Sequence, residues 1–170
     1  MRAALRVAAL AVLIVLTVTL QITVFSHFSL NGVVPDLALL IVIAAALVRG
    51  AGYGALVGFA AGLVLDLAPP ADHTAGRWAL SFVLAGYLTG LVKRDSEGSV
   101  VGTVVMVAAG AFVGTSVFAL TGLVLQDSGV TVASAFDVVP LAVLYDVMLT
   151  PLVIPLVVLL LRQLEPKERW

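Results

Sequence analysis

Four charged residues stand within or beside long apolar stretches of this 170-residue chain, of which only 11% is charged: Asp36, Asp66, Arg77 and Asp146. Pairs of carboxylates can act as general acid and base, and acids inside membranes also line ion or proton pathways. An isolated charge in an apolar interior is costly, so such groups are expected to be paired or to face a cavity. These four residues are therefore the first candidates for a functional site.

No other pattern in the sequence is typical of an enzyme. The chain has no cysteine, no HExxH or similar metal-ligand spacing and no G-x-S-x-G motif. His27 and His73 fall in different predicted loops, so they do not form a metal pair. We expect no catalytic residue, metal or cofactor, whereas a role in transport stays open because buried acids also serve ion pathways.

The composition is that of a polytopic membrane protein. Hydrophobic residues make up 62% of the chain, more than a soluble domain of this size can cover with so few charges. The net charge of -1 gives no broad basic surface for nucleic acid. The first apolar stretch is longer than a secretory signal core and lacks a small-x-small cleavage site, so we expect a retained span.

Six apolar segments predict an all-α membrane protein with six transmembrane helices in a single domain, residues 1–170. The segments are residues 3–25, 31–48, 51–67, 77–92, 100–125 and 138–161. About 20 residues cross a bilayer, which the first, fifth and sixth segments provide easily. The second reaches that length only if its helix starts before Pro35, and a re-entrant hairpin of the second and third segments is the alternative.

Basic residues predict the orientation, because they concentrate on the cytoplasmic side of membrane proteins. With the N-terminus inside, only Arg77 lies outside. The cytoplasmic side then holds eight basic residues: Arg2, Arg6, Arg49, Lys93, Arg94, Arg162, Lys167 and Arg169. We therefore expect both termini in the cytoplasm.

Glycines recur every fourth residue from Gly50 to Gly62, and Asp66 continues the series. On an α-helix this spacing forms one slowly drifting stripe of small residues, which lets a second helix approach closely. Two shorter pairs follow later in the chain. The predicted positions for helix packing or partner contact are Gly54, Gly58, Gly62, Gly86, Gly90, Gly110 and Gly114.

The four charged candidates all fall in the outer half of the predicted protein. Asp36 directly follows a proline, a pattern that also suits a helix N-cap, and Asp66 lies near enough to the surface for simple solvation. Asp146 lies about two helical turns inside the last segment and is the hardest to explain as a surface residue. The functional hypothesis is one outer polar cluster made of Asp36, Asp66, Arg77 and Asp146.

Three motifs occur in the order found in the rod shape-determining protein MreD family. They are "PDLALL" at residues 35–40, "GxxxGLVLDL" at 58–67 and "GYLTG" at 86–90. The chain size, the six segments, the basic N-terminus and the short polar C-terminus also resemble this family. The last segment is similar too, although the family more often has asparagine where Asp146 stands. The turn "APPADHTAG" diverges from the family, so no role passes to His73.

The resemblance implies a non-enzymatic subunit of the cell-elongation machinery in the bacterial cytoplasmic membrane. Its implied partners are an MreC-like protein and, indirectly, a RodA-type glycosyltransferase, a penicillin-binding transpeptidase and MreB. The resemblance also implies a fold like the substrate-binding S component of energy-coupling-factor vitamin transporters. That likeness supplies the alternative function, a small-molecule-binding transport component in which the outer polar cluster lines a pocket open to the exterior.

Overall fold

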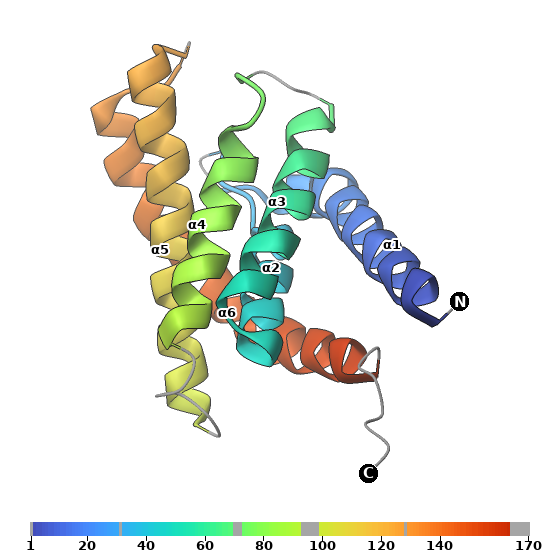
Figure 1. The fold of residues 1–170 in the computed structure, drawn as a ribbon. Helices are drawn as coiled ribbons and strands as arrows, with labels where there is room; N and C mark the ends of the chain where they lie inside the picture. The colour runs from blue at the N-terminus through green and yellow to red at the C-terminus, as the bar shows by residue number, and fades with distance from the viewer. Residues whose placement is uncertain (1, 31, 70–72, 93–98, 128, 164–170) are drawn as a thin grey trace.

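The computed structural model describes residues 2–30, 32–69, 73–92, 99–127 and 129–163, and these are almost entirely helical (Figure 1). The basic turn after Val92 and the C-terminal tail, which carry four of the eight residues behind the predicted orientation, lie outside these ranges. The helices are α1 (Arg2–Thr23), the 3-10 turn η1 (Phe25–Phe28), α2 (Leu37–Arg49), α3 (Ala51–Leu67), α4 (Arg77–Val92), α5 (Val100–Leu125) and α6 (Val132–Gln163).

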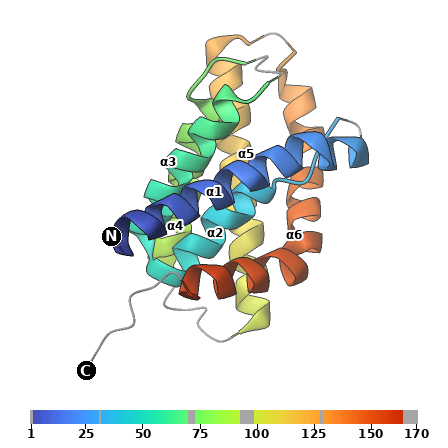
Figure 2. The ribbon, with the colours of Figure 1, turned by 90° about the vertical axis from the view of Figure 1, so that its right-hand side faces the viewer.

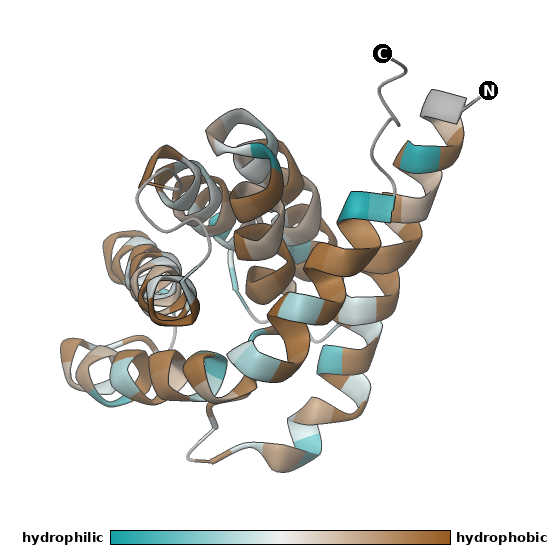
Figure 3. Cartoon of the chain, turned by 90° about the horizontal axis from the view of Figure 1, so that it is seen from below, coloured by the Kyte–Doolittle hydropathy of each residue, from teal (hydrophilic) through white to brown (hydrophobic). Residues whose placement is uncertain are grey.

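Three helices of the described chain are long and apolar enough to cross a membrane. They are α1 from Ala4, α5 and α6, whereas α2, α3 and α4 are shorter apolar helices. Large apolar side chains remain exposed along the long helices, for example Leu16 of α1 and Val124 of α5, which are 62% and 80% exposed. Figure 3 shows that hydrophobic residues predominate along the helices.

The predicted boundaries of α3, α4 and α5 agree with the structure, and those of α2 and α6 do not. Helix α2 begins at Leu37, so it does not start before Pro35, which was the condition for the second segment to reach spanning length. Helix α6 begins at Val132, six residues before the predicted residue 138. The Thr131 hydroxyl accepts a hydrogen bond from the Ser134 amide, and the Ser134 hydroxyl accepts one from the Thr131 amide. This reciprocal cap starts α6 in a stretch that is too polar for a hydropathy pattern to include.

Helix α2 is the centre of the bundle. Its first ten residues, Leu37 to Ala46, are all buried, as expected for a helix that is apolar on every side. It contacts α1, α3, α4, α5 and α6, and Figures 1 and 2 show it enclosed by these helices. Its 13 residues extend about 20 Å, which is shorter than a hydrocarbon layer of about 30 Å.

A single residue, Gly50, connects α2 to α3. Its φ of +82° lies in the left-handed region, which glycine adopts without steric cost, and its amide donates to the Ala46 carbonyl at 2.7 Å. The chain therefore reverses direction at once, and α3 packs back against α2. The predicted series of glycines begins at this turn.

Helix α6 changes direction where its prolines lie. Figure 2 shows its first half beside α5 and its second half turning across one end of the molecule. Pro151 and Pro155 lie inside the helix, and the Thr150 hydroxyl donates to the Asp146 carbonyl at 2.9 Å. Proline removes backbone hydrogen bonds, and this type of threonine bond also bends helices, so the bend has both causes.

The glycines of α3 and α4 bring these two helices into backbone contact. A Cβ at Gly54 would lie 2.5 Å from the Gly86 carbonyl oxygen, and one at Gly62 would lie 2.5 Å from the Ala79 Cα. A Cβ at Gly90 would overlap Ala51 in the same way. These positions therefore serve helix packing within the chain, one of the two roles that the spacing predicts.

The later glycines accommodate side chains of α2. A Cβ at Gly110 would lie 2.8 Å from Ile43 Cδ1, and one at Gly114 would lie 3.2 Å from Leu39 Cδ2. Both glycines belong to α5, so the central helix presses its large side chains into the small residues of that neighbour. Gly114 has slightly more room than Gly110, because 3.2 Å requires a smaller adjustment of the leucine.

Replacing Gly58 by alanine tests the close approach of α3 and α4. The added Cβ would lie 2.6 Å from the Phe82 carbonyl carbon, and backbone cannot move aside as a flexible side chain can. Gly58→Ala should lower the free energy of unfolding in detergent by about 1–3 kcal/mol. The matched control is Gly52→Ala in the same helix, where a Cβ meets no atom within 4 Å. Equal stability of the two variants would contradict this account.

Candidate functional site

The N-terminus of α2 is a buried helix start, and three side chains satisfy it. Asp36 caps its own helix, since its Oδ1 accepts a hydrogen bond from the Leu39 amide at 3.0 Å. Gln21 of α1 accepts from the Ala38 amide at 2.9 Å. Asp146 of α6 accepts from the amide of Asp36 itself at 2.8 Å. Backbone N–H groups that α-helices leave unpaired at their first turn are thus bonded from three different helices.

This arrangement lies out of contact with solvent. Asp146 is fully buried, and Asp36 and Gln21 are each 8% exposed. The alternative prediction that Asp36 caps a helix is confirmed, and Asp36 and Asp146 also meet, as the polar-cluster hypothesis expects. Asp146 Oδ2 has no hydrogen-bond partner within the part of the chain that the structure describes. One oxygen of this carboxyl therefore anchors α2, and the other is unused by these contacts.

Asp66 performs the same task for α4 from the end of α3. Its two carboxylate oxygens accept hydrogen bonds from the amides of Trp78 and Ala79, both at 3.1 Å. Asp66 is only 2% exposed, so the prediction of simple solvation is wrong for this residue. Negative charge is favourable at a helix N-terminus because the helix dipole is positive there. His73 Nδ1 lies 3.7 Å from Asp66 Oδ1, which places the histidine over the same helix start.

Arg77, the first residue of α4, pairs with an aspartate outside the predicted set. Its Nη1 lies 2.5 Å from Asp127 Oδ2, and its Nη2 donates to the Phe118 carbonyl at 2.7 Å. The guanidinium lies 3.9 Å above the Phe118 ring, a cation–π contact. Gly122 leaves the space in which this side chain lies, since a Cβ there would overlap the guanidinium. Arg77 therefore joins α4 to α5 and the connection after it.

Thr74 and two aromatic rings complete the contacts around Arg77 and Asp127. The Thr74 hydroxyl donates to Asp127 Oδ1 at 2.8 Å, and its amide donates to Oδ2 at 3.2 Å. These bonds, more than the neighbouring Arg77, hold the pKa of Asp127 below its ordinary value of 3.8. Trp78 stacks on Phe118 with ring centroids 3.9 Å apart. The loop before α4 is thus fixed to the end of α5 by polar and aromatic contacts together.

The four predicted residues therefore make their contacts at two separate helix starts. Asp36 and Asp146 meet at the start of α2, and Asp66 and Arg77 lie at the start of α4. Each aspartate accepts one or two hydrogen bonds from backbone amides, so these carboxyl groups have partners without a bound ligand. No group of three or more potential metal ligands occurs among the residues that the structure describes. The arrangement is suited to holding helices together.

The sequence analysis missed Gln21, Thr74, Phe118, Gly122 and Asp127. A usable signal existed for Gln21, the only amide side chain in α1, because a lone amide in an apolar helix needs a hydrogen-bond partner. The contact between Arg77 and Asp127 joins residues far apart in the chain, and nothing local in the sequence marks it. Gly122 lies eight residues after Gly114, in register with the four-residue spacing, but Phe118 interrupts the series.

The fold and these contacts define a helical membrane protein whose buried acids act chiefly as helix caps. Comparison with protein families takes the identification further. The family model for rod shape-determining protein MreD matches residues 1–164, and the chain belongs to this family. Membership assigns the chain to rod-shape determination, within a family of shape-determining proteins that is not known as an enzyme family. Neither the curated proteins nor the solved structures include a match to the chain.

Substitution of Asp146 tests the anchoring of α2. Asp146→Ala leaves the buried Asp36 amide without an acceptor, which should lower the free energy of unfolding by about 1–3 kcal/mol. Asp146→Asn should cost less, because the amide oxygen can accept the same bond. Asp137→Ala, on an exposed residue of the same helix, is the control and should change little. The proposed anchor would be refuted if Asp146→Ala were as stable as Asp137→Ala.

The lowered pKa of Asp127 predicts a pH dependence. A carboxyl whose pKa is lower in the folded than in the unfolded protein adds stability above the unfolded value, and this stability is lost as pH falls through the folded value. The extra stability of the unsubstituted protein over Asp127→Asn should be complete above pH 3.8 and disappear at more acid pH. Thermal unfolding of both proteins in detergent across this range measures it. A difference that does not change with pH would contradict the role of the charge.

Proposed function

We propose that the chain is a non-enzymatic membrane subunit of the bacterial cell-elongation complex. In this role it docks an MreC-like protein and, through it, supports peptidoglycan synthesis by a RodA-type glycosyltransferase and a penicillin-binding transpeptidase, linked to MreB. The observation that carries the proposal is the family match over residues 1–164. Rod-shape determination is the family's function, and the partners are the part that this proposal adds.

The distribution of contacts supports a structural role. The close contacts within the chain occupy five glycines of α3 and α4, so these act on a partner only by maintaining the fold: Gly54, Gly58, Gly62, Gly86 and Gly90. The exposed apolar surfaces belong mainly to the long helices α1, α5 and α6. In a membrane such surfaces meet either lipid or another transmembrane helix, and the membrane helix of an MreC-like protein has the matching chemistry.

The proposed topology has six crossings with both termini in the cytoplasm, in an arrangement like that of the S components of vitamin transporters. Two arginines in the described ranges support it. Arg6 and Arg49 line one groove near the N-terminal end of α1, together with Leu161 from the end of α6. Arg77 lies instead at the start of α4, in contact with the end of α5. This separation has the asymmetry that the positive-inside rule requires.

The alternative function, a substrate-binding transport component, needs the outer acids to face a pocket. Asp66 uses both carboxylate oxygens on backbone amides, and Asp36 and Asp146 each use one. Hydrogen bonds already made within the protein leave these groups less available to a ligand. The contacts therefore favour the structural role, and no observation in the described part of the chain favours transport specifically.

Affinity purification tests the proposal directly. The tagged protein, extracted from its own host into native nanodiscs, should recover an MreC-like protein together with peptidoglycan synthases, identified by mass spectrometry. A tagged membrane protein of unrelated function is the control for non-specific recovery. Recovery of ATPase subunits with a membrane coupling protein, and no MreC-like protein, would overturn the proposal in favour of the transport component.

A further inference from the structure

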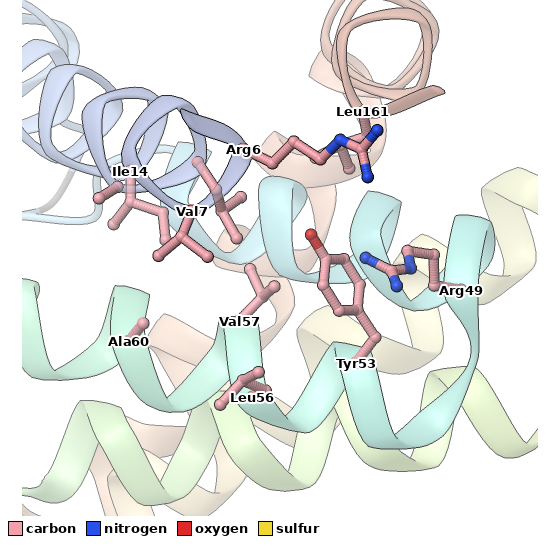
Figure 4. A pocket seen from close by; sticks show the side chains of 11 residues that line it. Arg6, Val7, Ile14, Arg49, Tyr53, Leu56, Val57, Ala60 and Leu161 are labelled. Carbon is pink, nitrogen blue, oxygen red and sulfur yellow. The ribbon is translucent and has the colours of Figure 1, made fainter. Parts of the chain in front are cut away.

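A groove of about 320 Å³ opens between α1, α3 and the last turns of α6 (Figure 4). It is separate from the two helix-capping sites and shares no residue with them. Arg6, Arg49 and Tyr53 lie at one end, and Leu10, Ile14 and Val57 are among the apolar side chains along the rest. Figure 4 shows both guanidinium groups and the Tyr53 hydroxyl at the same end of the groove.

The polar end carries positive charge without an acidic partner in the described structure. Within the described part of the chain, the close contacts between basic side chains and aspartates are those of His73 with Asp66 and of Arg77 with Asp127, and they do not include Arg6 or Arg49. The Arg49 guanidinium lies 4.2 Å above the Tyr53 ring. A guanidinium stacked on a ring keeps its N–H edge free for a bidentate contact with phosphate or carboxylate. This end of the groove therefore suits an anion.

The apolar part of the groove follows α1 into the membrane. Arg6 and Ile14 both line the groove, and their separation along the helix is about 12 Å at 1.5 Å per residue. Both belong to the membrane-spanning part of α1, which starts at Ala4. The charged end therefore lies near the membrane surface, and the apolar end lies within the hydrocarbon.

The groove is large enough for a single alkyl chain. An alkyl chain is only about 4 Å wide, since apolar carbon atoms meet at about 3.5–4.0 Å. A groove of about 320 Å³ therefore has room for roughly 25 Å of such a chain, because a cylinder about 4 Å wide encloses about 13 Å³ per Å of length.

We propose that this groove binds one anionic glycerophospholipid. The phosphate lies between Arg6 and Arg49, and one acyl chain follows the apolar wall past Leu10 toward Ile14 and Val57. Charge at one end and an apolar wall at membrane depth are the two properties that together select this ligand. The inference does not depend on the partners proposed above.

The test is a titration of the purified full-length protein in detergent with dioctanoyl phosphatidylglycerol, followed by native mass spectrometry. The double variant Arg6→Gln/Arg49→Gln should bind this lipid at least tenfold more weakly. Arg162→Gln, an exposed arginine in the last turn of α6, should bind it as the unsubstituted protein does. Dioctanoyl phosphatidylcholine, which has no net charge, should bind at least tenfold more weakly than the anionic lipid.

Four outcomes would overturn the proposal. They are unchanged binding by the double variant, equal binding of the uncharged lipid, displacement of the anionic lipid by inorganic phosphate at equal concentration, and unchanged lipid affinity with loss of a copurifying membrane protein. The third outcome would indicate a site for free phosphate, and the fourth a site for a protein helix. If the double variant does not fold, Arg49→Gln alone decides, because Arg49 is exposed and its loss leaves the core intact.

Discussion

A helix that begins inside an apolar interior must have its first N–H groups bonded, and the start of α2 shows how this requirement organises the protein. Water is not available there, so the acceptors come from Asp36, from Gln21 of α1 and from Asp146 of α6. Because the donors belong to the central helix, the same bonds fix α1 and α6 relative to it. The most deeply buried carboxyl group among the described residues is thus placed by a backbone requirement.

The first N–H groups of α4 are also bonded by an acidic side chain from another helix. Asp66 reaches across from α3 to the amides of Trp78 and Ala79, while Arg77 reaches out to Asp127 and Phe118. The glycines between α3 and α4 bring their backbones close enough for the first of these contacts, so packing and capping depend on each other. Acids that suggest catalysis or transport when viewed in the sequence therefore serve chiefly to hold short helices in place.

This arrangement suits a subunit that acts through surface contacts rather than by catalysing a reaction. The short helix α2 forms the closely packed centre, whereas α1, α5 and α6, together with α3 and α4, expose apolar side chains to their surroundings. A rigid interior lets such surfaces keep one shape for a partner helix or for lipid. Membership of the MreD family means that the protein carrying these surfaces acts in rod-shape determination.

The sequence by itself determined the membrane class, the family and the bounds of α3, α4 and α5, because hydropathy and glycine spacing are local properties of the chain. It also indicated Asp36 as a cap, since the proline before it and the apolar run after it are adjacent. Thr131 and Ser134 could have indicated the start of α6 as capping residues. A hydropathy pattern does not mark this start, because the stretch is polar. Only the tertiary structure decided which acceptor meets which amide, that Arg77 pairs with Asp127, and that Arg6 and Arg49 share one groove. Such contacts join distant segments, and their partners are set by how the helices pack around α2.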